Sequence, residues 1–296
     1  MSGWDPSGLT VYIDGSYVSG AEATVPIWDH GLLYGDGIFE GMRCFDGALF
    51  RPRDHVARLG RSARSLGLNM PLGPDELIEV ICEVIRRSDL RDAHVRPMVT
   101  RGVGMPGIDP TRCPDQTLIV AAYPFPPLLG DAPIRLLTSS VVRKAPRSVG
   151  AHIKSLNYLD GVIAKRQANA AGMNDAIMLD GQGAVAECTG ANVFAFFDGV
   201  LTTPTTRAAL PGITRRTIIE LAIEQGIPVE EREIYPMELY LADGAFITGS
   251  GAGVVAIAEI DGNPIPSSEH PLVQALRDGY RARTRDPRYV VPVYGG

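Results

Sequence analysis

Apolar and polar residues alternate in two stretches near the start of the chain, over residues 9–18 and 42–50. Each stretch contains an Asp-Gly pair, at Asp14-Gly15 and at Asp46-Gly47. Alternation is typical of half-buried strands, and Asp-Gly is typical of the tight turns that join them. The pattern therefore predicts two β-hairpins, and similar runs predict strands at 94–101 and 117–123.

The spacing of apolar residues changes to a helical one after residue 54. Apolar side chains recur every three or four positions from Val56 to Leu66, which predicts a helix with Asp54 as its N-cap and Gly67 as its stop. A second helix with the same spacing is expected to begin near Pro74.

Three prolines in four residues, at positions 124, 126 and 127, cannot continue a helix or a strand ladder. They predict a small N-terminal domain over 1–123, a linker over 124–133 and a larger C-terminal domain over 134–296. In the larger domain, strands are expected at 134–142, 175–179, 192–197, 245–248 and 254–260, and helices at 158–171 and 214–225. Strands and helices mix without strict β-α-β alternation, which indicates an α+β fold with antiparallel or mixed sheets.

Composition narrows the class of protein. The 296 residues are 45% hydrophobic and 21% charged with a net charge of −6, which is typical of a soluble globular protein and argues against nucleic acid or an anionic membrane as partner. No apolar run approaches the ~20 residues of a membrane span, and the first residues lack the pattern of a signal peptide, so a cytoplasmic location is expected. The four cysteines and five histidines are scattered, which argues against a disulfide framework or a metal site.

Lysine is rare, so lysine-dependent chemistry has only three candidates: Lys144, Lys154 and Lys165. Lys154 lies between apolar Ile153 and Leu156 and so at the edge of a core. A lysine in such surroundings is paired, reaches solvent or has a lowered pKa, and a lowered pKa makes it a nucleophile suited to a Schiff base. An ordinary surface lysine fits the same residues.

Two segments have the features of an anion site. Gly212-Ile213-Thr214 opens a predicted helix, whose unpaired N–H groups and dipole attract a phosphate, although Thr214 also fits a simple N-cap. The glycine-rich segment 249–253 follows a strand and fits either an anion loop or an ordinary turn. Glu187, among small apolar residues, is either solvated at a strand edge or buried with a partner.

Arg96 and Arg101 lie five residues apart on one predicted strand, so their side chains face opposite sides of the sheet and do not form one clamp. Either could hold a carboxylate through two hydrogen bonds. For Arg101 a solvated side chain is the expectation, whereas for Arg96 both readings stay open.

Five stretches, taken in order, resemble the class IV, or fold-type IV, pyridoxal-phosphate aminotransferases, and within them the branched-chain amino acid aminotransferases. They are residues 34–43, 153–159, 175–179, 186–194 and 210–215. The resemblance implies a two-domain α+β fold, pyridoxal 5'-phosphate bound between the domains, and a homodimer or larger assembly in which a partner loop helps to close each site. It also implies ping-pong transamination between an L-branched-chain or other hydrophobic L-amino acid and 2-oxoglutarate.

The resemblance assigns roles residue by residue. Lys154 matches the lysine that forms the Schiff base and moves the substrate proton, and Glu187 matches the carboxylate that pairs with the pyridine nitrogen. The other cofactor contacts that it implies are Arg58, Tyr158, Thr189, Ile213, Thr214 and Ser250. The residues that it implies for the substrate are Tyr34, Phe39, Gly41, Arg43, Arg96, Gly251 and Ala252.

Three departures from the family pattern fall on the substrate side. His94 stands where the family has the tyrosine of a Tyr-x-Arg motif, Phe125 and Leu128 replace a Trp and Tyr pair, and segment 249–253 differs from the usual Gly-Thr-Ala-Ala-Glu. Two alternatives therefore stay open. A D-amino acid aminotransferase would use Arg101 for the substrate carboxylate, although Val103 stands where that subgroup has a histidine. A lyase of the aminodeoxychorismate type would share the fold and the lysine.

Overall fold

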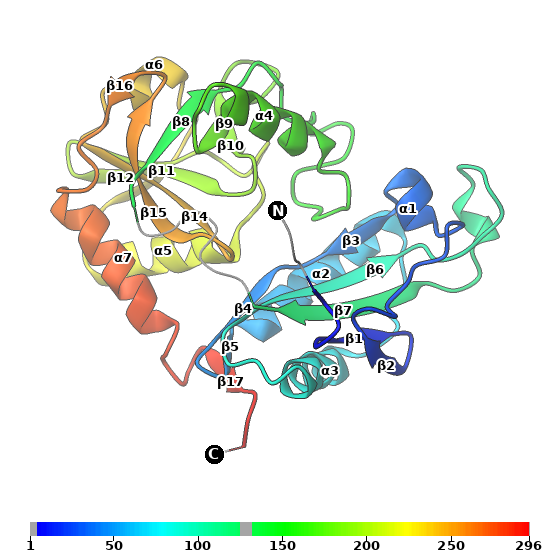
Figure 1. Ribbon diagram of the computed structural model, residues 1–296. Coiled ribbons are helices and arrows are strands. Elements are labelled where there is room, and N and C mark those ends of the chain that lie inside the picture. Colours follow the sequence, from blue (N-terminus) through cyan, green and yellow to red (C-terminus); the bar gives the residue numbers. More distant parts are fainter. Residues whose placement is uncertain (1–4, 125–131, 296) are drawn as a thin grey trace. The chain divides into compact units, whose positions relative to one another are not determined.

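The computed structural model describes residues 5–124 and 132–295, which form two compact units (Figure 1). The first unit comprises Met1–Phe125, Ile153–Asn157 and Thr284–Gly296, and the second comprises Pro126–His152 and Tyr158–Arg283. Residues 125–131, with Phe125 and Leu128, lie outside the described residues, so the predicted linker over 124–133 and the division into 1–123 and 134–296 stay predictions. The contacts show, however, that two later segments pack with the first unit.

An antiparallel sheet of eight described strands forms the first unit, in the order β17-β5-β4-β6-β7-β1-β2, with β3 paired to β6. The strands are β1 (Thr10–Ile13), β2 (Ser16–Ser19), β3 (Gly37–Phe39), β4 (Met42–Phe45), β5 (Ala48–Phe50), β6 (Ala93–Thr100), β7 (Thr117–Tyr123) and β17 (Val290–Pro292). Both predicted hairpins and both later strands are confirmed. The last strand of the chain pairs with β5 and was not predicted.

The helices of the first unit are α1 (His30–Tyr34), α2 (Pro52–Leu66) and α3 (Pro74–Arg87). The α2 helix packs on β3 and α3, and α3 packs on β1 and β7 (Figure 1). Gly67 ends α2 in the left-handed conformation, as predicted, but the N-cap prediction for Asp54 is wrong. The helix begins at Pro52, because the fixed φ of proline suits the first helical position, and Asp54 lies in the first turn.

A mixed sheet of nine described strands forms the second unit, in the order β10-β9-β8-β15-β14-β11-β12-β13, with β16 paired to β15. The strands are β8 (Ile134–Thr138), β9 (Asp175–Leu179), β10 (Val185–Cys188), β11 (Asn192–Phe197), β12 (Val200–Thr203), β13 (Val229–Glu231), β14 (Gly244–Gly249), β15 (Gly253–Ile260) and β16 (Asn263–Pro264). The pairs β8–β9, β8–β15 and β12–β13 are parallel, and the rest are antiparallel. The predicted α+β class with mixed sheets is confirmed.

Helices cover the second sheet. The α4 helix (Leu159–Ala170) packs on β9, whereas α5 (Ile213–Glu224) and α7 (Pro271–Arg283) pack on each other and on the strands β14 and β15 (Figure 1). A short α6 (Pro236–Leu239) completes the set. The strand predicted at 134–142 ends at Thr138. The Ser139 N–H still donates to the Ile177 carbonyl of β9 at 2.8 Å, but the Ser139 hydroxyl and the Ser140 N–H bond to the side chain of Gln167. The pattern gave no expectation for β10 or α7.

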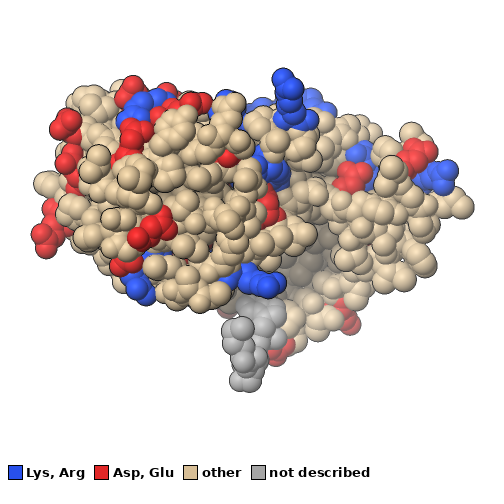
Figure 2. Space-filling view, turned by 90° about the horizontal axis from the view of Figure 1, so that it is seen from above, with Lys and Arg blue, Asp and Glu red and all other residues tan. Residues whose placement is uncertain are grey.

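On the face seen in Figure 2, basic and acidic side chains are interspersed in small groups. No helix among residues 5–124 and 132–295 has the length and apolar character needed to cross a membrane.

Candidate active site

Lys154 belongs to the first unit, and its backbone is fixed on both sides. Its N–H donates to Ser62 Oγ of α2 at 3.1 Å, and its carbonyl accepts from the Phe39 N–H of β3 at 2.9 Å. The next residue, Ser155, forms an isolated antiparallel bridge with Ile38. The segment Ile153–Asn157 is therefore held against β3, so Lys154 has a defined position within this unit.

Two of the predicted site residues, Lys154 and Arg96, place their nitrogen-bearing groups over the ring of Phe39. Lys154 Nζ lies 4.3 Å from the ring centroid, and Arg96 Cζ lies 4.7 Å from it. Arg96 Nε is buried and has no hydrogen-bond partner within the described chain. A buried donor without a partner is costly, and a carboxylate bound there would satisfy it.

His94 and Arg43 are direct neighbours across β6 and β4. A Cβ at position 41 would come within 3.1 Å of the His94 ring, so Gly41 is what allows the imidazole to occupy this place. Burial first, and then the charges of Arg96 and Arg43, lower the pKa of His94 to about 3. The imidazole is therefore neutral and adds no charge to the arginines beside it.

Arg58, the residue predicted to contact the phosphate, forms a buried ion pair with Glu40. Arg58 Nε and Nη2 lie 2.6 and 2.8 Å from the two carboxylate oxygens. His55 Nδ1 lies 2.8 Å from Glu40 Oε2, and all three side chains are buried. Ser62, which accepts from the Lys154 N–H, follows on the same face of α2, so one helix face carries His55, Arg58 and the support of the lysine.

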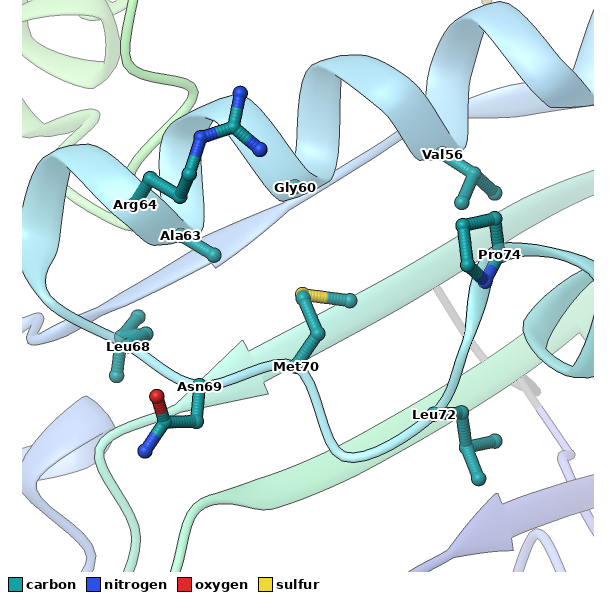
Figure 3. Close-up of a pocket in the computed structure, with 9 residues that line it drawn as sticks. All are labelled: Val56, Gly60, Ala63, Arg64, Leu68, Asn69, Met70, Leu72 and Pro74. Carbon is teal, nitrogen blue, oxygen red and sulfur yellow. The ribbon is translucent and has the colours of Figure 1, made fainter.

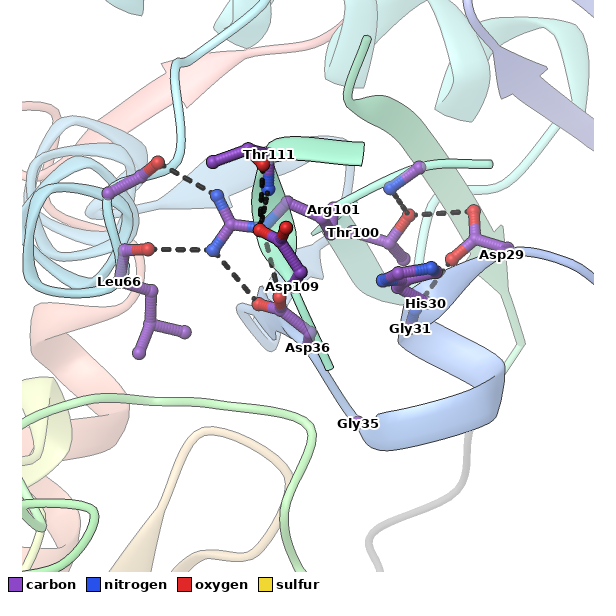
Figure 4. Close-up of polar contacts among 12 residues, drawn as sticks. Asp29, His30, Gly31, Gly35, Asp36, Leu66, Thr100, Arg101, Asp109 and Thr111 are labelled. Atoms are coloured by element: carbon purple, nitrogen blue, oxygen red, sulfur yellow. Dashed lines mark hydrogen bonds and ion pairs between the residues drawn. The ribbon is translucent and has the colours of Figure 1, made fainter. Parts of the chain in front are cut away.

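Arg101 is not solvated, and that expectation is wrong. Only 8% of it is exposed, and its guanidinium bonds to both carboxylate oxygens of Asp36 at 2.9 and 3.1 Å and to the carbonyls of Leu66 and Gly67 at 2.7 and 2.8 Å (Figure 4). These contacts tie the end of α2 to the turn before β3. The side chain has a structural role in this unit.

Tyr34, predicted at the substrate pocket, lies at the end of α1. Its hydroxyl accepts from the Gly107 N–H at 2.7 Å. The start of the same helix is held by Asp29, which accepts from Gly31 N–H and from the hydroxyl of Thr100 (Figure 4). The segments 29–34 and 100–107 are therefore joined.

Glu187 lies on β10 in the second unit and is buried with a partner, which decides between the two readings of the sequence. Arg143 donates to Glu187 Oε1 through Nε at 2.9 Å and Nη2 at 2.6 Å, and through Nη1 to Asp160 at 2.6 Å. The guanidinium lies 5.7 Å from the ring centroid of Tyr158, the predicted phenolate contact. Arg143 thus fixes the carboxylate beside that tyrosine.

The second oxygen of Glu187 is tied to the start of α5. Leu210 N–H donates to Glu187 Oε2 at 3.0 Å, and Asn192 donates to the Leu210 carbonyl at 2.9 Å. Gly212 is the N-cap of α5, and a Cβ there would come within 2.1 Å of the Asn192 side chain. The N-cap is therefore Gly212 and not Thr214, which leaves the buried Ile213 and Thr214 as the first helical residues.

Thr189 and the predicted anion loop lie in the same unit. The Thr189 hydroxyl donates to Asp175 at 2.6 Å. Ser250, Gly251 and Ala252 form the turn between β14 and β15. Gly249, at the start of this turn, lies close to the Gly190 backbone: a Cβ at position 249 would come within 3.3 Å of the Gly190 carbonyl oxygen. The hydroxyl of Thr248 is fully buried and has no partner among the described residues.

The sequence predictions missed the residues that hold the candidates in place: Glu40, His55 and Ser62 in the first unit, and Arg143, Asp160 and Asn192 in the second. Glu40 was visible as a lone carboxylate between Phe39 and Gly41 in an otherwise apolar stretch. Arg143 gave no local signal, because its partners lie 17 and 44 positions away.

A hollow of about 300 Å³ in the first unit lies away from the candidates (Figure 3). It is lined by Val56, Gly60, Ala63, Arg64, Leu68, Asn69, Met70, Leu72 and Pro74. At about 100° per residue, the lining residues of α2 lie on the helix face opposite to His55, Arg58 and Ser62. The hollow therefore has no part in the candidate site.

The candidates have the chemistry that pyridoxal phosphate requires. The first unit supplies the amine of Lys154 and the guanidinium of Arg58, and the second supplies the carboxylate of Glu187 and the N-terminus of α5. An amine suits the aldehyde, cationic and N–H groups suit the phosphate, and a carboxylate suits the pyridine nitrogen. The orphaned Thr248 hydroxyl and Arg96 Nε are further donors that a bound anion would satisfy.

Comparison with known proteins gives the same result. The family described as amino-transferase class IV matches residues 37–260. A branched-chain-amino-acid aminotransferase of Pseudomonas aeruginosa is 36% identical over 95% of this chain and 94% of its own. A crystal structure of a branched-chain aminotransferase from Thermoproteus uzoniensis with norvaline superimposes with a TM-score of 0.92 at 34% identity, covering 97% of this chain and 99% of that one.

A third relative bears on the cofactor. The branched-chain amino acid aminotransferase from Thermobaculum terrenum, solved in its PLP form (holo form), has a TM-score of 0.86 at 30% identity and covers 98% of this chain and 100% of that one. With the fold, the donor set and the family match in agreement, the chain belongs to the class IV, fold-type IV aminotransferases, which depend on pyridoxal phosphate, and within them it is of the branched-chain aminotransferase type.

Proposed function

We propose that this aminotransferase moves the amino group of an L-branched-chain or other hydrophobic L-amino acid to 2-oxoglutarate by a ping-pong mechanism. The observation that carries the proposal is the position of Lys154, which is held by Ser62 and Phe39 with its amine over the Phe39 ring. The relatives support the substrate class, since they are named as branched-chain aminotransferases and one was solved with norvaline.

The cofactor, when bound, supplies an electron sink for the carbanion that forms at the substrate α-carbon. In the proposal, the Lys154 amine would hold the cofactor through its aldehyde and would move the proton at the substrate α-carbon. Glu187 would hold the proton on the pyridine nitrogen, and Arg143 fixes the Glu187 carboxylate in place through two hydrogen bonds. Arg58, Ile213, Thr214 and Ser250 bind the phosphate, and Tyr158 and Thr189 complete the cofactor contacts.

For the substrate, we assign the α-carboxylate to the amides of the 250–252 turn, with Gly251 and Ala252, and the side chain to Tyr34, Phe39, Gly41, Arg43 and Arg96. Phe39 offers an apolar surface for a branched side chain. Arg96 and Arg43 offer cations for the acidic second substrate, and the neutral His94 lies beside them. One pocket can therefore accept both substrates in turn.

The D-amino acid aminotransferase alternative is not favoured. It needs Arg101 to grip a substrate carboxylate, and that guanidinium is already bonded to Asp36, Leu66 and Gly67. The lyase alternative is not favoured by the relatives either, which are named as aminotransferases.

We also propose a homodimer in the cytoplasm. Large apolar side chains are exposed on the joined segments 27–34 and 103–108 of the first unit, including Ile27 at 63%, Leu32 at 64% and Ile108 at 89%. Contiguous exposed apolar side chains mark association surfaces. All four cysteines are free and buried, as suits a reducing compartment.

The test of the activity is the visible spectrum of the purified protein before and after L-leucine is added. The expected result is a cofactor band that L-leucine bleaches and that 2-oxoglutarate restores. A band that L-leucine leaves unchanged while D-alanine bleaches it would discard the L-branched-chain assignment. Lys154→Ala should lose the band and turnover but keep the far-UV circular dichroism of the fold, and full activity in this variant would contradict the role of the lysine.

The dimer is tested by sedimentation of the wild type and of Leu32→Glu. A charge at this exposed position costs the first unit little, so the variant should stay folded but sediment as a monomer. Thr111→Glu, on the exposed 3₁₀ turn at 110–112, is the control and should leave the dimer intact. A wild type that sediments as a monomer would exclude the proposed assembly.

A further inference from the structure

The buried triad of Glu40, His55 and Arg58 is a feature that the proposed chemistry does not itself require. Glu40 has no exposed surface, and only 2% of His55 and 3% of Arg58 is exposed. Glu40 comes from the segment between β3 and β4, whereas the other two come from successive turns of α2. A carboxylate buried at this depth is expensive unless every charge and hydrogen bond is satisfied.

The contacts within the triad fix the protons. The two short bonds from Arg58, together with the bond from His55, hold the pKa of Glu40 well below its usual range, although burial opposes them. Burial lowers the pKa of His55, so its ring is neutral. Since Glu40 is ionised and can only accept, His55 Nδ1 carries the proton and donates it to Glu40 Oε2.

The geometry fixes the arginine more tightly than a single contact would. The Glu40 carboxylate meets the edge of the guanidinium formed by Nε and Nη2, which leaves the plane and direction of the group no freedom to turn. The Glu40 N–H donates in turn to the Pro97 carbonyl of β6 at 2.9 Å, so the backbone that carries the carboxylate is bonded to the sheet.

We infer that Glu40, supported by His55, is a positioning residue that orients Arg58 toward the cofactor phosphate. The inference rests on the proposed function, in which Arg58 binds that phosphate. Two opposite effects decide whether Glu40 strengthens or weakens the binding of the phosphate. A charge on Glu40 repels the phosphate, whereas the fixed arginine removes the cost of ordering a long flexible side chain on binding. The short paired bonds and complete burial favour the second effect.

The test compares the apoenzyme's affinity for pyridoxal phosphate with its affinity for pyridoxal, which has the aldehyde and ring but no phosphate. The dissociation constant for pyridoxal divided by that for pyridoxal phosphate measures the contribution of the phosphate, because Lys154 and Glu187 act on both ligands. Glu40→Gln keeps the shape of the side chain and removes its charge. It should weaken pyridoxal phosphate by roughly 10- to 100-fold, the range of one charge-assisted hydrogen bond, and leave pyridoxal nearly unchanged.

Asp36→Asn is the matched control, because Asp36 also bonds to Nε and Nη2 of an arginine, Arg101, in the same unit. It should leave the ratio at the wild-type value even if it lowers stability. If Glu40→Gln does not fold, Glu40→Asp decides instead: it keeps the charge but withdraws the carboxylate by about one bond length, roughly 1.5 Å, and should reduce the ratio partially.

The outcomes separate this inference from the proposed function. An unchanged or higher preference for pyridoxal phosphate in Glu40→Gln, together with a lost preference in Arg58→Lys, would overturn the positioning role and leave the phosphate role of Arg58 intact. An unchanged preference in Arg58→Lys would overturn both roles while the cofactor still binds. A wild type that binds neither ligand would refute the proposed function itself.

Discussion

His94 is a single imidazole among cations, and its surroundings set its proton. The side chain packs over Gly41, forms a ring contact with Tyr123 at 5.5 Å and lies beside Arg43 and Arg96. Neither burial nor these charges tolerate an imidazolium. A neutral ring can accept or donate a hydrogen bond toward a substrate without repelling a hydrophobic side chain, which suits a pocket that takes apolar and acidic substrates alternately.

The lowered pKa of His94 predicts how stability depends on pH. The unfolded chain binds a proton on this histidine below about pH 6.5, whereas the folded protein does so only near pH 3, so acid favours unfolding between these values. From pH 7 to pH 5 the apoenzyme should lose about 2 kcal/mol of unfolding free energy from His94 alone. His55, whose pKa is also lowered, acts in the same direction.

The measurement is urea unfolding of the apoenzyme and of His94→Gln at pH 7 and pH 5. The variant should lose about 2 kcal/mol less than the wild type over this interval. His152→Gln, which removes an exposed histidine, is the control and should keep the full loss. Equal losses in wild type and His94→Gln would show that this imidazole is protonated in the folded state.

At this scale the sequence offered candidate residues but not how they are held. Lys154 and Glu187 drew attention as ionisable groups among apolar neighbours, and the resemblance to the family gave them their expected roles. Glu40 gave the same kind of signal and was overlooked, whereas Arg143 gave none, because an ion pair between distant segments leaves no periodicity in either of them. Arg101 was misjudged for the same reason, since its acceptors Asp36 and Leu66 lie 65 and 35 positions away.

Among the elements, α2 combines several tasks on separate faces. One face carries His55, Arg58 and Ser62 toward the candidate site, another packs Val56, Leu59 and Ala63 into the core, and the last turn offers its carbonyls to Arg101. A cation at a helix C-terminus is stabilised by the helix dipole as well as by the hydrogen bonds. Arg101 thereby fixes the end of the helix on which the site residues depend.

Replacing Arg101 should therefore affect stability more than substrate recognition. Arg101→Met leaves Asp36 and two carbonyls without their donor and should lower the unfolding free energy by about 3 kcal/mol, with little change in KM for the amino donor at a temperature where the variant is folded. Urea unfolding and steady-state kinetics check the two parts. Arg112→Met, from an exposed ion pair, should cost at most about 1 kcal/mol. A large rise in KM with unchanged stability in Arg101→Met would revive the D-amino acid reading.

Elements with a clear local signal were predicted, and those without one were missed. The two hairpins, α2 and α3 follow from alternation or helical spacing within the segment itself. The strands β9 and β11 are buried on both faces and were predicted as short apolar runs. The strand β10, Val185-Ala186-Glu187-Cys188, is also buried on both faces, but Glu187 interrupts its apolar run. The strand β17 consists of only three residues, whose strand conformation depends on the edge of β5.

For the whole molecule, the first unit depends on residues from the end of the chain. Besides the pairing of β17 with β5, Val293 is buried in the first core, and the Tyr294 hydroxyl donates to the Leu90 carbonyl at 2.8 Å. The Arg51 N–H donates to the Tyr289 carbonyl at 2.7 Å at the start of α2. The last segment thus stabilises the element that carries Arg58.

A chain that ends at Arg283 should lose the stability of this segment. Loss of the Val293 burial and of the hydrogen bonds should lower the unfolding free energy of the first unit by about 3 kcal/mol or more. A thermal scan of the truncated and full chains measures the shift. A chain that ends at Tyr294 is the control and should melt like the full chain, whereas an unshifted transition after truncation at Arg283 would show that β17 contributes nothing.

The pairing of β5 with β17 has a consequence for synthesis on the ribosome. A nascent chain exposes the edge of β5, which ends at Phe50, long before its partner strand β17 begins at Val290, 240 residues later. Since synthesis proceeds at roughly 5–20 residues per second, the edge of β5 stays unpaired for on the order of tens of seconds. During this interval an unpaired strand is open to other nascent chains on the same polysome. Chaperone binding to ribosome-bound chains should therefore persist until β17 has been made and has left the ribosome.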